Sequence, residues 1–302
     1  SPFLLVIVML LRRPTFLLMF ILGCSLEPLP QSWQLDRVRL LGVKATPAEP
    51  RPGETTQFES LVYMPEGTQH ESTLWFACLP EDSSSFGCTL DSDAAAALES
   101  ADSEELSDEE LYAQLIEAGL IGAEPYWAPS WTPPADALDA LSPEEQIEGL
   151  SATVNVTLLL SGEEDAGDPE LAFKRVPVSL ATHPNHNPEI VGLRVDDEVL
   201  RLGAALNTVP GAVHTIEPVL SDDSIETYTY VDSAGVCEER IEAPYFTWYT
   251  EGGQPDSPFT LYPFSSIEWT APETSFSGLL VVVARDRRGG MAWAHLDVVV
   301  ED

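Results

Sequence analysis

Apolar and polar residues alternate along much of the chain. Val38–Val43 and Thr56–Tyr63 follow the two-residue period of half-buried strands, and Pro-Gly pairs separate such runs. Near the C-terminus, Val281–Val283 and Val298–Val300 are joined through Arg285–Gly290, whose two glycines suit the positive φ angles of a tight loop. The pattern predicts a mainly β protein that ends on a closing hairpin.

Five landmarks occur twice in the same order: a Gly before an aliphatic and a basic residue, a Pro-Gly turn, a Trp beside an aromatic residue, a Trp-Thr pair before Pro, and two closing apolar strands. The first copy has Gly42–Lys44, Pro52–Thr55, Trp75–Phe76, Trp131–Pro134, and Thr153–Leu160 with Lys174–Leu180; the second has Gly192–Arg194, Pro210–Val213, Trp248–Tyr249, Trp269–Pro272, and Leu279–Ala284 with Trp293–Val300. A Trp in mid-strand suits the centre of an immunoglobulin-like core. The repeat predicts two tandem immunoglobulin-like β-sandwiches, residues 35–182 and 183–302, with Trp75 and Trp248 at equivalent core positions.

The copies differ most between their Trp landmarks, where the first carries a surplus that we expect to be an acidic helical insertion at 89–149. Ser103 or Ser107 can cap a helix that ends at Gly119, and Ser142 can cap a second helix with Pro and Glu in its first turn. Because the second copy joins the same landmarks directly, the insertion is predicted to be dispensable for the fold. The alternative is an integral layer that packs apolar side chains onto the sandwich: Leu111, Leu115, Ile116, Leu138 and Leu141.

The N-terminus contains two apolar runs separated by Arg12 and Arg13. Each charge at mid-bilayer would cost about 2.5–3.5 kcal/mol, so a single transmembrane span centred there is disfavoured. Read from Met9, a short basic region and the apolar stretch Phe16–Leu22 have the architecture of a signal peptide. Ser1–Val8 would then lie upstream of the true start.

The apolar stretch ends in Ile21–Cys24, which resembles the bacterial lipobox. In lipobox proteins the Cys thiol is diacylglycerated, the peptide is cleaved before it, and the acyl chains anchor the protein at about 0.8 kcal/mol per buried methylene. The resemblance implies a lipoprotein signal peptide at 1–23, lipidation of Cys24 and a tether at 24–34. Since Ser25 rather than Asp follows, Gram-negative sorting rules imply the outer membrane, on its periplasmic or surface face. An ordinary secretory peptide is the alternative.

The charge is strongly unbalanced, with 50 acidic and 14 basic residues and a net charge of −36. Removal of Arg12 and Arg13 would leave about −38, and no Lys or Arg occurs between Pro52 and Phe173, where there are 27 Asp and Glu residues. Such a field repels phosphate backbones, so the composition excludes a nucleic-acid partner. A solubilising extracellular-type surface explains the acidity, and divalent-cation binding is the alternative.

Three cysteines remain if Cys24 is lipidated. In an oxidising envelope compartment, Cys78 and Cys88, separated by nine residues, are expected to form a disulfide. Cys237 would then be a buried free thiol, or would pair with Cys88 instead. The acids at Glu238 and Glu239 disfavour the thiolate that a Cys nucleophile needs.

The segment between the copies, His183–Glu189, contains His183 and His186, which would need two further ligands to hold a metal. We therefore expect no metal and no cofactor. The same segment resembles cadherin linkers, with His186 where that pattern has Asp, and Asp286 matches an Asp of cadherin- or PKD-like hairpins. The resemblance keeps calcium as an alternative, although Arg287 replaces a second acid that calcium would need.

Over nearly its full length the chain resembles the surface lipoproteins of myxobacteria and related deltaproteobacteria. The features that carry this resemblance are the lipobox, the Leu35–Arg39 entry into the first strand, the turn at Pro52–Thr55 and the end pattern Arg285–Gly290. It implies an envelope location and tandem immunoglobulin-like domains, without an activity. The sequence has no Gly-x-Ser-x-Gly elbow, phosphate loop or His-Glu-x-x-His motif, so we predict that the protein is not an enzyme.

Two functions remain for such a protein. The first is a lipid-anchored, non-catalytic binding or structural module that contacts an envelope protein or polysaccharide. The second is an accessory subunit of an envelope machine that docks a membrane partner. An apolar patch at Tyr126, Trp127 and Trp131 would favour docking, although such residues near prolines also suit a local core.

Overall fold

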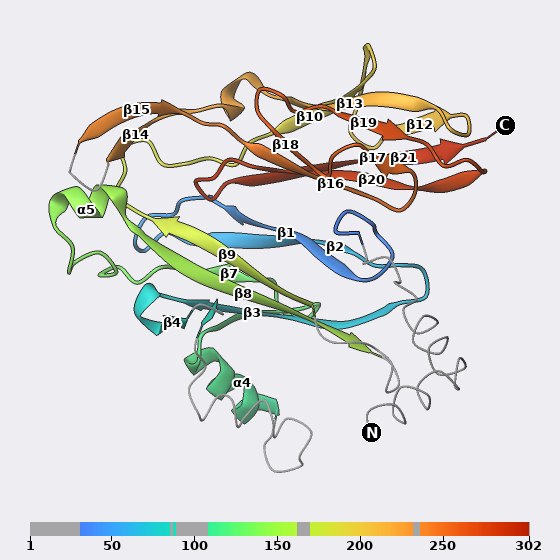
Figure 1. The fold of residues 1–302 in the computed structure, drawn as a ribbon. Coiled ribbons are helices and arrows are strands. Elements are labelled where there is room, and N and C mark those ends of the chain that lie inside the picture. Colours follow the sequence, from blue (N-terminus) through green and yellow to red (C-terminus); the bar gives the residue numbers. More distant parts are fainter. Residues whose placement is uncertain (1–30, 85–86, 89–107, 162–169, 232–235, 302) are drawn as a thin grey trace, which may run out of the picture. The chain divides into compact units, whose positions relative to one another are not determined.

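The computed structural model of the protein describes most of the chain, and the described part is mainly β (Figure 1). The described ranges are 31–84, 87–88, 108–161, 170–231 and 236–301. Residues 33–302 form one compact unit. The predicted signal peptide, Cys24, most of the tether and the candidate caps Ser103 and Ser107 lie outside the described residues. Within the described residues, no helix combines the length and apolar character that a membrane crossing requires.

Two larger antiparallel sheets of the first half, here called the first sheet pair, have strand orders β1-β2-β7 and β6-β3-β8-β9. A separate short pair joins β4 (Ser83–Ser84) to β5 (Gly87–Cys88). The strands are β1 (Arg39–Thr46), β2 (Thr56–Tyr63), β3 (Gln69–Cys78), β6 (Leu120–Glu124), β7 (Ser130–Trp131), β8 (Leu150–Ser161) and β9 (Glu170–Val178). Both sheets contribute to one buried core, from Val43 and Phe58 on one side to Trp75 and Val154 on the other.

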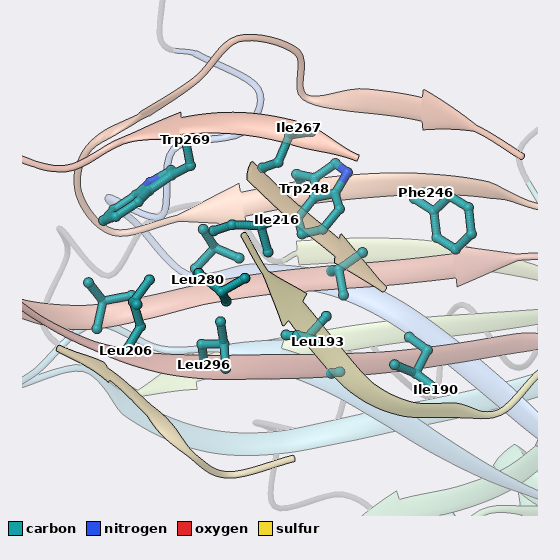
Figure 2. Close-up of a cluster of buried hydrophobic side chains, with 14 of the residues drawn as sticks. Ile190, Leu193, Leu206, Ile216, Phe246, Trp248, Ile267, Trp269, Leu280 and Leu296 are labelled. Carbon is teal, nitrogen blue, oxygen red and sulfur yellow. The ribbon is translucent and has the colours of Figure 1, made fainter. Parts of the chain in front are cut away.

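The second half repeats this plan in the second sheet pair, with strand orders β11-β10-β13-β19-β17 and β12-β21-β20-β16-β18. The strands are β10 (Ile190–Val195), β11 (Glu198–Leu200), β12 (Ala205–Thr208), β13 (Val213–Leu220), β16 (Tyr245–Thr250), β17 (Gln254–Pro255), β18 (Phe259–Leu261), β19 (Ile267–Thr270), β20 (Phe276–Arg285) and β21 (Met291–Val300). Figure 2 shows Ile216, Trp248 and Trp269 among the side chains of its core.

The strand orders confirm the internal repeat. The series β10-β13-β19 corresponds to β1-β2-β7, and β18-β16-β20-β21 corresponds to β6-β3-β8-β9. Trp75 in β3 and Trp248 in β16 lie in corresponding strands and are 0% and 1% exposed, as predicted. The glycine landmarks also correspond, because a register shift precedes Gly42 in β1 and Gly192 in β10.

The Pro-Gly landmarks form the same turn in both halves. Gly53 and Gly211 have φ angles of 78° and 71°, a region that residues with a Cβ rarely adopt. Their N–H groups donate to the carbonyls of Pro133 and Pro272, which follow the Trp-Thr landmark of each half. The repeated sequence signal therefore reflects a turn that is tied to the same distant segment in each copy.

A third core joins the two sheet pairs. Leu41 in β1 packs with Val281 and Val283 in β20, and Leu35 and Met291 complete the buried cluster. Strand β20 is thus buried on both faces, since Val282 between these two valines lies in the second core.

The residues next to the predicted tether are held by the second sheet pair. The N–H of Leu35 donates to the carbonyl of Thr250 (2.9 Å), and the N–H of Thr250 donates to the carbonyl of Trp33 (3.0 Å). The chain is therefore fixed from residue 33 onward, inside the segment predicted as tether.

The predicted helical insertion at 89–149 is helical only in part. The segment contains α4 (Asp108–Glu117) and α5 (Pro143–Glu148), but it also contains β6 and β7, which are members of the first sheet pair. The predicted cap is confirmed, because Ser142 and Glu145 form a capping box. Leu115 of α4 is buried against Phe76 and Leu120, so α4 forms part of a packed layer.

The second half carries an insertion that the sequence pattern did not lead us to expect. Between β13 and β16 the chain forms a short 3₁₀ turn, Asp222–Ser224, and a two-stranded antiparallel ribbon of β14 (Thr227–Val231) and β15 (Cys237–Ile241). We call this the β14–β15 ribbon (Figure 1). In the first half the equivalent connection between β2 and β3 is only residues 64–68.

Candidate functional site

The turn between β20 and β21 is organised by Asp286, which is only 2% exposed. Its Oδ1 accepts three backbone N–H groups, at 2.7 Å from Arg288, 3.0 Å from Gly289 and 2.9 Å from Gly290. A Cβ at Gly290 would lie 2.0 Å from Asp286 Oδ2, so this position requires glycine. The conformation directs the Arg288 side chain toward a group of carboxylates.

Arg288 joins three glutamates that come from separate parts of the chain. Its guanidinium lies 3.7 Å from Glu49, 3.0 Å from Glu226 and 2.9 Å from Glu242, and it stacks 4.5 Å over the ring of Tyr228. Glu49 follows β1, whereas Glu226 and Glu242 flank the β14–β15 ribbon. We call these five residues the Arg288 clamp.

The segment that follows the first sheet pair contributes asparagines to the same region. Asn185 donates its backbone N–H to Glu49 (2.6 Å) and its Nδ2–H to Asp286 (2.8 Å). Asn187 donates to the carbonyl of Ala45 (2.7 Å) and accepts from the N–H of Met291 (2.9 Å). The predicted linker is therefore hydrogen-bonded to both sheet pairs.

Burial changes the acid–base properties of two charged residues here. Lys174 donates to the carbonyl of Gly289, and burial lowers the pKa of its amine to about 8, with Asp286 partly opposing the shift. Burial also raises the pKa of Glu242, against the hydrogen bond from the Glu226 N–H and the charge of Arg288. Burial is the main cause of both shifts.

These residues do not fit a calcium ion. Calcium takes about 6–8 oxygen ligands, but both oxygens of Asp286 already accept hydrogen bonds and the glutamates pair with Arg288. His186 bonds to Glu226 at 2.7 Å. Across the part of the chain that the structure describes, no group of three His, Cys, Asp or Glu residues is placed to hold a metal. The guanidinium of Arg288 supplies the positive charge that a cation would bring.

The cysteines pair as expected. Cys78 at the end of β3 and Cys88 in β5 (Gly87–Cys88) form a disulfide, with Cα atoms 5.6 Å apart. This pairing excludes the alternative bridge from Cys88 to Cys237. Cys237 is a free thiol, but the expectation that it is buried is wrong, because it lies in β15, whose residues are all exposed.

One hydrogen-bonded chain has the residue types of a nucleophile and base pair, and sequence spacing did not reveal it. Asp196 Oδ2 lies 2.9 Å from His214 Nδ1, and His214 Nε2 lies 2.7 Å from the hydroxyl of Thr208. Asp196 has a φ of 53° and also accepts the N–H of Thr215 at 2.9 Å. The hydrogen bond from His214 lowers the pKa of Asp196. We interpret this chain as a link between β12, β13 and the turn after β10.

A cavity and exposed aromatic residues lie on the surface of the described residues. A cavity of about 360 Å³ between β13 and the β18–β19 connection is lined by Tyr262 and by the ion pair of Arg194 and Glu217 (2.5 Å). Beside it, Phe264 is 83% exposed. In the first half, the predicted patch divides, since Tyr126 is 80% exposed while Trp131 packs against the first core.

No protein family model and no curated protein matches this chain. Among solved structures, it is similar to the fibronectin(III)-like modules of Clostridium thermocellum CbhA, at 11% identity and a TM-score of 0.21 over 86% of this chain and 94% of that one. Dimeric latent PorU from Porphyromonas gingivalis matches at 11% identity and a TM-score of 0.22, over 88% of this chain and 24% of that one. Zebrafish RET cadherin-like domains 1 to 4 match at 10% identity and a TM-score of 0.13, over 76% and 40%.

Proposed function

We propose that the protein is a lipid-anchored envelope protein in which two immunoglobulin-like sandwiches act as a non-catalytic binding or structural module. The strand orders support the sandwich assignment, because each half has a three-strand and a four-strand series around a buried Trp. The observation that carries the functional proposal is the third core. This core joins the two halves into one body, so a binding surface on one half keeps a fixed position relative to a surface on the other half.

The proposed location rests on the lipobox at Ile21–Cys24. A lipidated Cys24 would hold the protein at the outer membrane, with a short connection to Trp33, where hydrogen bonds to Thr250 begin.

The proposed partner is an envelope protein or a polysaccharide, because the net charge of −36 repels nucleic acid. The hydrogen-bonded chain from Asp196 to Thr208 does not change the non-catalytic assignment. It connects β12 and β13 to the turn after β10, a role that needs no substrate.

A specific observation favours the second function, an accessory subunit that docks a membrane partner. Tyr126 and Trp127, in the turn between β6 and β7, are 80% and 38% exposed. Exposed aromatic residues that lie together often mark contact sites.

A cross-linked pull-down from solubilised envelopes tests the proposal. We expect the intact protein to recover a defined protein or polysaccharide, and a Tyr126→Ser/Trp127→Ser variant to recover the same partner if the binding module is the correct function. Loss of the partner in that variant would favour the docking subunit. Recovery of nothing above the background of an unrelated acidic lipoprotein would overturn both.

A further inference from the structure

The β14–β15 ribbon stands out because it has almost no core of its own. Every residue of β15 is exposed, and in β14 Thr227, Thr229 and Tyr230 are exposed as well. A two-stranded ribbon is at best marginally stable in water. Something other than its own packing must therefore hold it in place.

The Arg288 clamp provides that support. Glu226 and Glu242 stand immediately before β14 and after β15, and the N–H of Glu242 donates to the carbonyl of Glu226 at 2.9 Å. Arg288 pairs with both carboxylates and stacks on Tyr228. A buried charged cluster thus fixes the base of the ribbon and its direction relative to the sheets.

The two edges of the ribbon differ in chemistry. β15 carries Glu238, Glu239 and Arg240, charges of the kind that guard sheet edges against pairing. β14 reads Thr-Tyr-Thr-Tyr-Val, without a charge or a proline and with high strand propensity. Within the described residues, β14 pairs only with β15, so its other edge carries unpaired backbone groups.

We infer that the free edge of β14 is a docking surface that accepts an extended, basic segment of a partner protein as an added strand. The inference rests on the proposed binding function and names the surface and the kind of partner. Backbone hydrogen bonds to β14 would supply affinity, as in other strand-addition complexes. The basic character follows from charge complementarity, because Asp222 and Asp223 precede β14 and the whole chain is acidic.

The test uses a capped synthetic peptide in which Lys alternates with Val and Thr, and a peptide of the same charge with Pro at its centre. Amide hydrogen exchange of the whole protein is measured with each peptide, alongside a titration of affinity. We expect the first peptide to protect the β14 amides and the Pro peptide to leave them unprotected, because Pro cannot complete the ladder.

Two variants with the same charge change separate edge pairing from general attraction. Thr227→Lys/Thr229→Lys and Glu239→Lys each make the net charge of the ribbon more positive by two units. An added strand would lie about 4.8 Å from β14 and about twice as far from β15. We therefore expect at least about a tenfold loss of affinity in the first variant and a much smaller loss in the second.

Several results would overturn the inference. Equal binding of both peptides, equal losses in both variants, or exchange protection outside β14 would each do so. Dimerisation of the protein through β14, seen by light scattering, would assign the edge to a second copy. Residues 227–241 can also be replaced by a Gly-Ser linker. If the envelope pull-down is then unchanged, β14 is not the docking surface, and the proposed binding function still stands.

Discussion

Replacing Arg288 by Met tests how the halves and the ribbon are held. The substitution keeps much of the side-chain volume but removes the positive charge shared by Glu49, Glu226 and Glu242. The Glu242 side chain is 2% exposed and Arg288 is 17% exposed, so the glutamate would remain as a buried charge without its cation. Breaking a buried pair in this way costs about 3–5 kcal/mol.

Urea unfolding followed by Trp fluorescence measures this loss in a soluble form of the protein. Arg240→Met is the matched control. Its ion pair with Glu238 has side chains 44% and 52% exposed, and such pairs contribute about 0–1 kcal/mol. Equal losses in the two variants would refute the reasoning, because burial would then not distinguish the clamp from a surface pair.

The loss in the Arg288→Met protein should also depend on pH. Without Arg288, the folded pKa of Glu242, already raised by burial, should rise further above its unfolded value. The folded state then binds the proton more tightly than the unfolded state, so the penalty is full above the folded pKa and shrinks as pH falls from there toward the unfolded pKa. A loss that stays constant from pH 7 to pH 5 would contradict this assignment.

Three further predictions concern stability. The Lys174 amine has a folded pKa of about 8 against 10.5 in the unfolded state, so between these values the unfolded state binds the proton more tightly. The free energy of unfolding should therefore rise by up to about 3 kcal/mol from pH 8 to 10.5, and Lys174→Met should abolish this rise in urea titrations. Trp75→Ala and Trp248→Ala should each cost about 3–5 kcal/mol in the same assay, and a loss under 1 kcal/mol would argue against equivalent core positions. Replacing residues 89–149 by a short linker should abolish cooperative thermal unfolding of the first half, because β6 and β7 are removed with this segment. An unchanged thermal transition would show instead that the segment is dispensable for the fold.

Local patterns predicted much of the fold. The alternation at Thr56–Tyr63 matches β2, and the capping box at Ser142 and the Cys78–Cys88 bridge both form. Each of these features depends on residues close in sequence or on a strict two-residue period. The repeat was detectable because its turn glycines need a backbone conformation that few other residues adopt.

The sequence contains a signal for the third core. Val281–Val283 is a continuous apolar run, and such runs indicate a strand buried on both faces rather than one face of a sandwich. The structure divides the run accordingly, with Val282 in the second core and its neighbours in the third. What the sequence could not provide was the partner of the second face, because Leu41 is more than two hundred positions away.

The Arg288 clamp could not be predicted because its members are scattered along the chain. Arg288 stood out only as part of a turn, and Glu49, Glu226 and Glu242 were three acids among 50. The β14–β15 ribbon did have a signal in the alternation of Thr227–Tyr230. The comparison of the two copies does not reveal this signal, because the first copy has no equivalent segment.

The measurement that tests the central claim most directly is metabolic labelling with a clickable fatty acid in cells that express the intact chain or its Cys24→Ala variant. The account predicts label and outer-membrane fractionation for the intact chain, and loss of both in the variant with its folded β body retained. Equal labelling of the two proteins would contradict a lipid-anchored binding module.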